Sequence, residues 1–250
     1  MKKLMPKYKL IVEYDGFNFV GWQRQQNGKS VQGELEAALF DLTKVKVQVH
    51  GAGRTDSGVH AQGQVAHCDI TREISSDTLR DALNHFLRKV PISILKVEEV
   101  NGNFHARFSA LKRHYLYRIL NRRPPPTFDK NRIWWTPSHL DAKAMHMAAQ
   151  TLVGTHDFSS FRATSCQAKS PIKTLDQLKV ERIGDEIRVT TSAKSFLQHQ
   201  VRNLVGTLTM VGYGKWNLDD VRSVLNAQDR SLAGPTAPAY GLYLVPVDYL

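Results

Sequence analysis

Residues 50–61 read His50-Gly51-Ala52-Gly53-Arg54-Thr55-Asp56-Ser57-Gly58-Val59-His60-Ala61. This stretch places one carboxylate, that of Asp56, between glycines, an arginine and a histidine. Glycine lets a backbone turn tightly and approach a ligand closely, while Arg54 and His60 suit contact with a carboxylate or a phosphate. These residues leave two interpretations open. Either Asp56 and Thr55 satisfy local backbone groups in a hairpin turn, or the loop presents an acid.

Strands and helices are predicted on both sides of this stretch. Residues 8–14 alternate as in a strand, and Ser30 precedes apolar residues at helical spacing. Residues 45–49 and 64–70 are predicted to be the strands that enter and leave the glycine-rich stretch, which puts Asp56 on a loop between strands. A second helix over residues 79–87 and a further strand over residues 92–100 follow.

A similar order of elements is predicted after residue 103, without a repeat of the residues themselves. The elements expected there are a strand at 114–120, a helix at 141–153 closed by Gly154, a hairpin of 172–182 and 186–192 around Gly184-Asp185, a helix from Leu197 through Leu208, a helix capped by Asn217, and a strand at 242–247.

This pattern predicts an α+β fold. We expect two related α/β halves with largely antiparallel sheets flanked by helices, and an active-site cleft between them. The predicted domains are residues 1–103, which carry the Asp56 loop, and residues 104–250.

The composition is that of a folded, basic protein. The 250 residues are 42% hydrophobic, and 34 Lys and Arg against 23 Asp and Glu give a formal net charge of +11. Such an excess favours a polyanionic partner, with RNA or DNA as the leading class. The two cysteines, Cys68 and Cys166, are too far apart and too few for a disulfide framework or a zinc site. With neither a membrane-spanning apolar run nor a signal peptide in the pattern, we expect a cytoplasmic protein.

Several familiar chemistries do not fit the glycine-rich stretch. Asp56 stands where a dinucleotide fingerprint has its third glycine, and Val59 stands where a phosphate-binding P-loop has its lysine. Ser57 and His60 lack the surroundings of a nucleophile elbow, and the ten histidines show no paired metal-ligand spacing. The sequence therefore predicts neither a metal nor a cofactor.

Two residues of the second half are candidates for partners of Asp56. Tyr115 and Tyr117 share one face of a predicted strand, and a tyrosine can stack on a flipped base and offer its hydroxyl. Ordinary filling of a sheet is the competing interpretation, and it is the favoured one for Tyr117. Arg202 borders the apolar stripe of a predicted helix, where an arginine commonly extends to solvent.

The chain resembles the TruA family of tRNA pseudouridine synthases from about Tyr8 to Tyr249. Besides residues 50–61, the segments that carry the resemblance are Tyr14-Asp15-Gly16, Gly21-Trp22-Gln23-Arg24-Gln25, Phe104-His105-Ala106-Arg107-Phe108-Ser109-Ala110, Asp157-Phe158-Ser159-Ser160-Phe161-Arg162, Val201-Arg202-Asn203 and Gly241-Leu242-Tyr243-Leu244.

The resemblance implies a homodimeric isomerase that binds the anticodon arm of tRNA. It would convert uridines 38, 39 and 40 to pseudouridine without a cofactor. By the same resemblance, Asp56 is the catalytic aspartate, and Tyr115 is the active-site tyrosine that stacks on the base. Arg202 is implied as a catalytic residue beside Asp56, and Arg54 as a contact for the extruded nucleotide.

Further questions stay open at this point. His60, Arg24 and Arg162 are additional candidates for substrate binding. Asp56 could attack C1′ or C6 of the nucleotide, or assist a glycal route by taking the 2′ proton. The alternative function is a non-catalytic RNA-binding or RNA-folding protein, and a third is a small-molecule hydrolase that uses Asp56 and His60.

Overall fold

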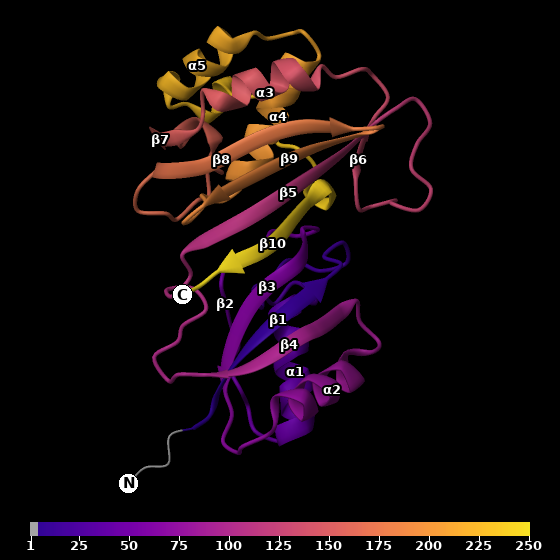
Figure 1. The fold of residues 1–250 in the computed structure, drawn as a ribbon, viewed down its shortest axis with the longest axis vertical. Coiled ribbons are helices and arrows are strands. Elements are labelled where there is room, and N and C mark those ends of the chain that lie inside the picture. The colour runs from indigo at the N-terminus through magenta and orange to yellow at the C-terminus, as the bar shows by residue number, and fades with distance from the viewer. Residues whose placement is uncertain (1–4) are drawn as a thin grey trace. The chain divides into compact units, whose positions relative to one another are not determined.

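The computed structural model describes residues 5–250, and the chain divides into two compact units. Unit 1 is Met1–Leu111 together with Leu244–Leu250, and unit 2 is Lys112–Tyr243. Each unit combines helices with strands that pair mainly antiparallel (Figure 1). The predicted α+β class and the mainly antiparallel pairing of its strands are therefore confirmed.

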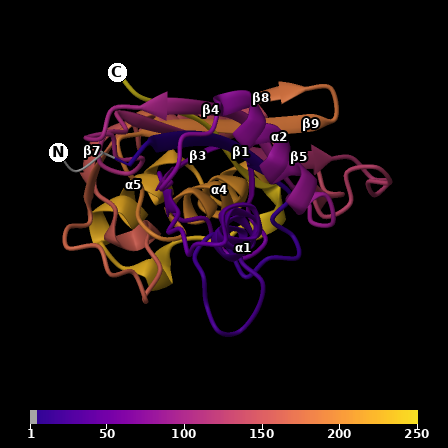
Figure 2. The ribbon, with the colours of Figure 1, turned by 90° about the horizontal axis from the view of Figure 1, so that it is seen from below.

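Unit 1 is built on a sheet in the order β4-β1-β3-β10, with β2 paired to β3. β1 is antiparallel to both of its neighbours, and α1 and α2 pack on each other beside the strands (Figure 2). Its elements are β1 (Lys7–Tyr14), α1 (Val31–Thr43), β2 (His50–Gly51), β3 (His60–Asp69), α2 (Ser76–Leu87), β4 (Ile92–Val100) and β10 (Leu242–Asp248), of which β10 joins the unit from Leu244 onward.

The alternation of residues explains the central strand of unit 1. Tyr8, Leu10, Val12 and Tyr14 all lie on one face of β1 and are at most 3% exposed. α1 starts where the sequence predicts, because the Ser30 side chain accepts a hydrogen bond from the backbone N–H of Gly33. The apolar face of β1 and the capped helix together position the chain that leads into residues 50–61.

Residues 45–49 do not form the predicted strand. Side chains of α1 and its C-terminal end satisfy this segment's backbone instead: the Thr43 hydroxyl accepts from Val45 N, Glu36 Oε1 accepts from Val49 N, and Gln32 Nε2 donates to Val49 O. Only His50 and Gly51 pair with β3. The apolar alternation correctly indicated that Val47 and Val49 are buried. The backbone of the segment, however, bonds to side chains of α1 instead of to a neighbouring strand.

Unit 2 contains a sheet in the order β5-β9-β8-β7, with β6 paired parallel to β5. Helices α3, α4 and α5 contact one another, and α3 packs on β8 (Figure 1). Its regular elements are β5 (Lys112–Asn121), β6 (Trp134–Thr136), α3 (Ala142–Gln150), β7 (Gly154–Asp157), β8 (Ile172–Ile183), β9 (Glu186–Ala193), α4 (Gln200–Gly212) and α5 (Leu218–Ala227), with short 3-10 turns at Ser159–Phe161, Arg230–Leu232 and Ala239–Gly241.

The sequence located most of these elements and misplaced some ends. The β8–β9 hairpin turns at Gly184, whose φ is +59°, and a capping box with Asn217 starts α5, both as predicted. α3 ends at Gln150 rather than at 153, and Leu197 lies before α4, because His199 takes a left-handed φ of +63° and starts the helix after it. β6 and β7, which are only three and four residues long, were not predicted.

Three chemical features of residues 5–250 concern membrane spans, metal sites and thiols. No helix in this range is both long and apolar enough to cross a membrane. No cluster of three or more His, Cys, Asp or Glu in the same range is arranged to hold a metal ion. Cys68 is buried and Cys166 is half-buried, and both are free thiols.

Candidate active site

Asp56 lies in a tight turn between β2 and β3. The backbone N–H of Val59 donates to the carbonyl oxygen of Asp56 at 3.1 Å, and Gly58 closes the turn with a φ of +79°. Asp56 itself is half-buried, while the neighbouring Arg54 is exposed. The backbone of Asp56 is therefore fixed in the turn, which agrees with both interpretations of the sequence.

Thr55, the residue before Asp56, ties this turn to the end of β1. Its hydroxyl lies 2.8 Å from the Tyr14 hydroxyl in a buried hydrogen bond, and its carbonyl accepts from Trp22 N at 3.1 Å. Tyr14 reaches this point because it pairs with Ala61 at the start of β3, after an irregularity in the β1–β3 register. A second tie joins Gln64 Nε2 to the Gly53 carbonyl at 2.8 Å. Residues on both sides of Asp56 are thus held from inside the unit.

The Tyr14 hydroxyl is in an environment that keeps it protonated. Burial raises its pKa to about 12, although hydrogen bonds from Thr55 and Gln64 act in the opposite direction. Gln64 is completely buried, and its Oε1 is one of two buried side-chain polar atoms without a hydrogen-bond partner in residues 5–250. The turn is consequently supported by a small network of uncharged polar groups that are buried in unit 1.

Two glycines outside residues 50–61 let the backbone come close to the turn. A Cβ on Gly16 would lie 1.8 Å from the Val59 carbonyl oxygen. Gly21 has a φ of +114°, and its Cβ would lie 2.7 Å from the Thr55 carbonyl oxygen. Both positions require glycine, because the obstacle in each case is backbone that cannot rotate away.

His60 is 2% exposed and contacts the chain just after β1. Its Nδ1 lies 3.1 Å from Gly16 N and 3.0 Å from Asp15 Oδ1. A hydrogen bond from Gly16 needs a lone pair on Nδ1, whereas one to Asp15 needs a proton there, so the protonation of this nitrogen selects between the two contacts. Either contact fixes residues 15–16 against the start of β3.

In unit 2, Tyr115 lies on the buried face of β5 and is 8% exposed. The Phe196 ring packs against it edge to face, with centroids 5.1 Å apart and an interplanar angle of 86°. Tyr117, two residues along the same face, is fully buried and donates its hydroxyl to the Pro238 carbonyl at 2.7 Å. Tyr117 is therefore part of the core, as favoured from the sequence, whereas Tyr115 keeps a small exposed fraction.

Arg202 lies in the first turn of α4 and is half-exposed. Its Nε donates to the Ala237 carbonyl at 2.8 Å, and Ala237 N donates back to the Arg202 carbonyl at 3.1 Å. The segment that bears Ala237 packs tightly on α4, since a Cβ on Gly206 would lie 1.6 Å from the Pro235 carbonyl oxygen. This hydrogen bond restrains the guanidinium of Arg202, whereas an arginine that extends freely into solvent would have no such restraint.

The matches to known proteins cover almost all of these segments. A family model described as tRNA pseudouridine synthase matches residues 10–109 and 148–250. The tRNA pseudouridine synthase A of Xanthobacter autotrophicus is 59% identical over 98% of this chain and 100% of its own length. Those of Paramagnetospirillum magneticum and Rhizobium meliloti are 58% and 56% identical, over 98% of this chain and 96% and 100% of their lengths.

The chain belongs to the TruA family of tRNA pseudouridine synthases. The family is one of isomerases, and the chain is therefore an enzyme of that class. Among solved structures, that of a Cbf5-Nop10-Gar1 complex aligns with 94% of this chain and 57% of its own, at 10% identity and a TM-score of 0.36.

The residues proposed for the TruA site are divided between the two units. Unit 1 holds Asp56, Arg54, His60 and Arg24, and unit 2 holds Tyr115, Arg202 and Arg162. Within unit 1, Arg24 pairs with Glu36 of α1 at 2.9 Å. Arg162 is half-exposed and follows the 3-10 turn at Ser159–Phe161.

The sequence did not identify the residues that support the turn carrying Asp56. Tyr14 was noted only as part of a motif, and Gln64 only as the start of a strand, yet both hold the backbone around Asp56. The alternation of β1 marks Tyr14 as buried, and a buried hydroxyl needs a partner. That signal predicts a hydrogen bond, but it does not identify Thr55 as the partner 41 residues away.

Proposed function

We propose that this enzyme converts uridines 38, 39 and 40 in the anticodon arm of tRNA to pseudouridine, with Asp56 as the catalytic carboxylate. The observation that carries the proposal is the half-buried Asp56 in a turn fixed through Thr55, Gly53 and Val59. A net charge of +11 suits an RNA substrate. The names of the relatives specify tRNA and pseudouridine, and we propose positions 38, 39 and 40 in addition.

The reaction needs a precisely held carboxylate rather than a redox group. The bond from N1 to C1′ breaks, the uracil turns, and C5 bonds to C1′; a proton leaves C5 and N1 gains one, so the atoms balance. Asp56 acts as a nucleophile at C1′ or C6, or takes the 2′ proton on a glycal route. Each of these routes requires an ionised carboxylate on a backbone that does not move as the base turns.

We assign Tyr115 and Arg202 of unit 2 to the same reaction, in an active-site cleft formed by the two units. The Tyr115 ring would stack on the target uracil, and Phe196 packs edge to face against this ring and restrains its plane. Arg202 would pair with the Asp56 carboxylate, with its Nε already held by Ala237. The contacts that restrain the two side chains support a positioned role for each.

The remaining substrate contacts are proposed on charge and location. Arg54, which is exposed beside Asp56, would occupy the space of the extruded nucleotide or hold its phosphate. Arg24 and Arg162 would contact the RNA backbone. His60 stays a predicted substrate contact, although its 2% exposure and its contacts with Gly16 and Asp15 also fit a role in shaping the loop. We further propose a cytoplasmic homodimer that works without a cofactor.

Replacement of Asp56 by Asn tests the assignment. The amide keeps the size and the half-buried setting, so tRNA binding is expected to persist while pseudouridine formation on an unmodified tRNA transcript is lost. Carbodiimide-dependent primer extension measures the product and its positions, and filter binding measures affinity. Ser57→Ala, one residue further along the turn, is the control and should retain product.

Two outcomes would favour the alternatives. Product from Asp56→Asn at the wild-type rate would overturn the catalytic role of the carboxylate. Binding without product by the wild-type chain would favour a non-catalytic RNA-binding or RNA-folding protein. Turnover of free nucleosides would instead favour the small-molecule hydrolase that uses Asp56 and His60.

A further inference from the structure

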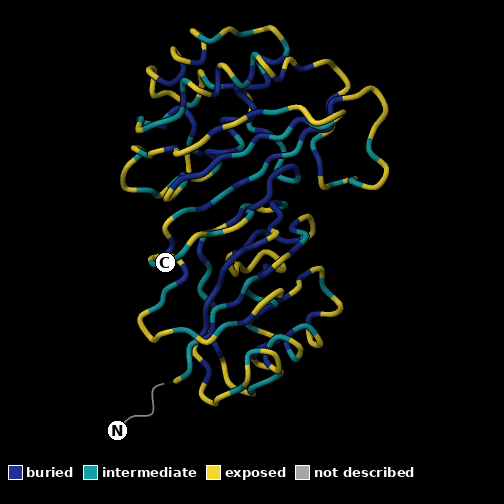
Figure 3. Tube along the Cα trace, viewed as in Figure 1, coloured by how far each residue is buried: buried dark blue, intermediate teal, exposed yellow. Residues whose placement is uncertain are grey.

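The segment between β5 and β6 presents an aromatic side chain almost entirely to solvent. Phe128 is 93% exposed, compared with 74% for Phe108, and the surrounding residues are mostly exposed as well (Figure 3). A solvated phenyl ring offers apolar surface that a partner can cover favourably. Figures 1 and 2 both show this segment extending away from the strands that it connects.

The segment is anchored on both sides of Phe128. Arg118 of β5 pairs with Asp129 at 3.2 Å and with Glu186 at 3.0 Å. On the N-terminal side, Trp135 Nε1 donates to the Arg122 carbonyl at 2.9 Å. Phe128 is therefore held outward by chain that is fixed at its base.

Further contacts close the C-terminal side of the segment. Tyr243, which is 6% exposed, donates its hydroxyl to the Arg132 carbonyl at 2.5 Å, and Arg118 lies over the Tyr243 ring. Arg132 N donates to the Asp129 carbonyl at 2.9 Å. Three consecutive prolines, residues 124–126, also limit the backbone before Phe128. Little conformational freedom remains to be lost when a partner binds, which favours affinity.

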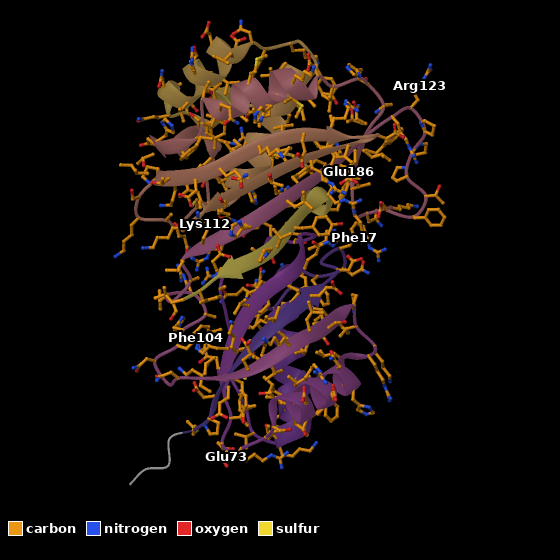
Figure 4. The ribbon with its side chains drawn as sticks, in the orientation of Figure 1. Phe17, Glu73, Phe104, Lys112, Arg123 and Glu186 are labelled. Atoms are coloured by element: carbon orange, nitrogen blue, oxygen red, sulfur yellow. The ribbon has the colours of Figure 1, made fainter. Side chains whose placement is uncertain are left out.

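The charge of the segment identifies the chemistry of the partner. Residues 122–132 contain four cations, Arg122, Arg123, Lys130 and Arg132, and one carboxylate, Asp129, which is neutralised by Arg118. Arg123 and Lys130 are exposed and make no ion pair among residues 5–250 (Arg123 is labelled in Figure 4). Lysine and unpaired charge are depleted from the cores of protein interfaces, whereas aromatic rings flanked by cations are typical of single-stranded RNA contacts.

We propose that residues 122–132 form an RNA contact in which Phe128 stacks on an unpaired base of the tRNA while Arg123 and Lys130 bind the flanking phosphates. The proposal deepens the proposed function and rests on it, because tRNA is the RNA on which the family acts. It makes this segment a substrate-binding element that is separate from Asp56, Tyr115 and Arg202. Its contribution is to affinity rather than to the chemical step.

Substitutions at Phe128 separate stacking from simple apolar contact. Phe128→Ala is expected to raise the Kd for unmodified tRNA by roughly 5- to 100-fold, as for the loss of one stacked base. The single-turnover rate at saturating enzyme should stay unchanged. Phe128→Trp should restore affinity, and Phe128→Leu, which lacks a π face, should not. Phe86→Ala on α2, where the side chain is 40% exposed, is the matched control.

Salt dependence separates the ring from the cations. Arg123→Ala and Lys130→Ala are each expected to reduce the slope of log Kd against log salt concentration by about 1, whereas Phe128→Ala leaves the slope unchanged. The 93% exposure of Phe128 predicts an unchanged melting temperature for its variants. A lowered affinity therefore reports a lost contact and not a lost fold.

Wild-type affinity in Phe128→Ala would overturn the proposal, as would equal rescue by Leu and Trp. Light scattering covers the competing protein contact: a change of oligomeric state with unchanged tRNA affinity would show that Phe128 contacts another copy of the chain. The proposed function and the Phe128 contact can fail separately. If the proposed function is wrong, the wild-type enzyme forms no pseudouridine, but Phe128→Ala still weakens tRNA binding.

Discussion

The hydroxyls of Tyr14 and Thr55 lie 2.8 Å apart in a buried hydrogen bond, one residue before the Asp56 carboxylate. This contact joins the end of β1 to the turn that carries the proposed catalytic group. A buried hydroxyl without a partner is costly, so the pair fixes the Thr55 rotamer and, through the chain, the position of Asp56. Uncharged contacts from the core of unit 1 thus hold the backbone beside Asp56.

Tyr14→Phe is expected to lower kcat for pseudouridine formation by about 10- to 100-fold, because a small displacement of a reacting group is costly. KM for tRNA should change little, since the lost hydroxyl is buried. The stability cost is expected to be about 1 to 2 kcal/mol, the usual cost of an unsatisfied buried partner. Steady-state kinetics and urea denaturation measure the two effects.

Tyr8→Phe is the matched control for this substitution. Tyr8 lies on the same face of β1, is 1% exposed, and donates its hydroxyl to the Ile74 carbonyl at 2.8 Å. Its loss should cost similar stability with unchanged kcat. An equal fall of kcat in both variants would mean that the Tyr14 effect is one of general stability and not of Asp56 placement.

Alkaline stability provides a second test of the Tyr14 environment. The folded-state pKa is raised by burial from 10.0 to about 12, so the unfolded chain loses this proton first. The contribution is fully present below pH 10 and is lost as the pH rises toward 12, by at most about 3 kcal/mol. The stability difference between wild type and Tyr14→Phe should therefore shrink over this window in pH-dependent denaturation. A constant difference would contradict the raised pKa.

Local signals in the sequence predicted most elements, and long-range partners explain the errors. Ser30 and Asn217 identified helix starts because a cap is a contact between near neighbours. Residues 45–49 alternated like a strand, yet Glu36 and Gln32 supplied the hydrogen bonds that a neighbouring strand would have made. Alternation reports burial, and it does not report which group satisfies the backbone.

The same distinction applies to the candidate site. The glycine-rich stretch was sufficient to select Asp56, since its unusual residues are adjacent in the chain. The Tyr14 contact depends on the β1–β3 register, including its irregularity between Val12 and Tyr14, and the Gln64 contact with Gly53 lies where the chain leaves the β2–β3 pairing. No pattern within a single strand encodes that register, so the support of the turn became visible only in the structure.

Acid stability should depend on His67 of β3. Burial is the main cause that lowers its pKa from 6.5 to about 4, and the nearby His105, His50 and Lys7 lower it further. Its Nδ1 accepts a hydrogen bond from Ala106 N. The folded-state pKa is depressed, so stability is complete above pH 6.5 and is lost as the pH falls toward 4. His67→Gln should flatten the stability profile in this window, measured by urea denaturation.

The exposed His85 of α2 supplies the control for that experiment. His85→Gln should leave the slope of stability against pH between 4 and 6.5 unchanged. The same steep slope in His67→Gln as in the wild type would assign the acid sensitivity to other groups.

Gly16→Ala should damage both stability and catalysis. The new Cβ would lie 1.8 Å from the Val59 carbonyl oxygen, and Val59 closes the Asp56 turn, so backbone must move. We expect a loss of about 3 kcal/mol or more in unfolding free energy, with a fall in kcat that stabilising osmolytes do not restore. Gly184→Ala is the comparison, because a Cβ there has nothing within 4 Å and meets only the strain of a φ of +59°. That variant should lose only about 1 to 2 kcal/mol and keep its kcat. A loss at Gly16 no larger than that at Gly184, with kcat retained, would show that contact with the turn at Val59 does not decide the outcome at Gly16.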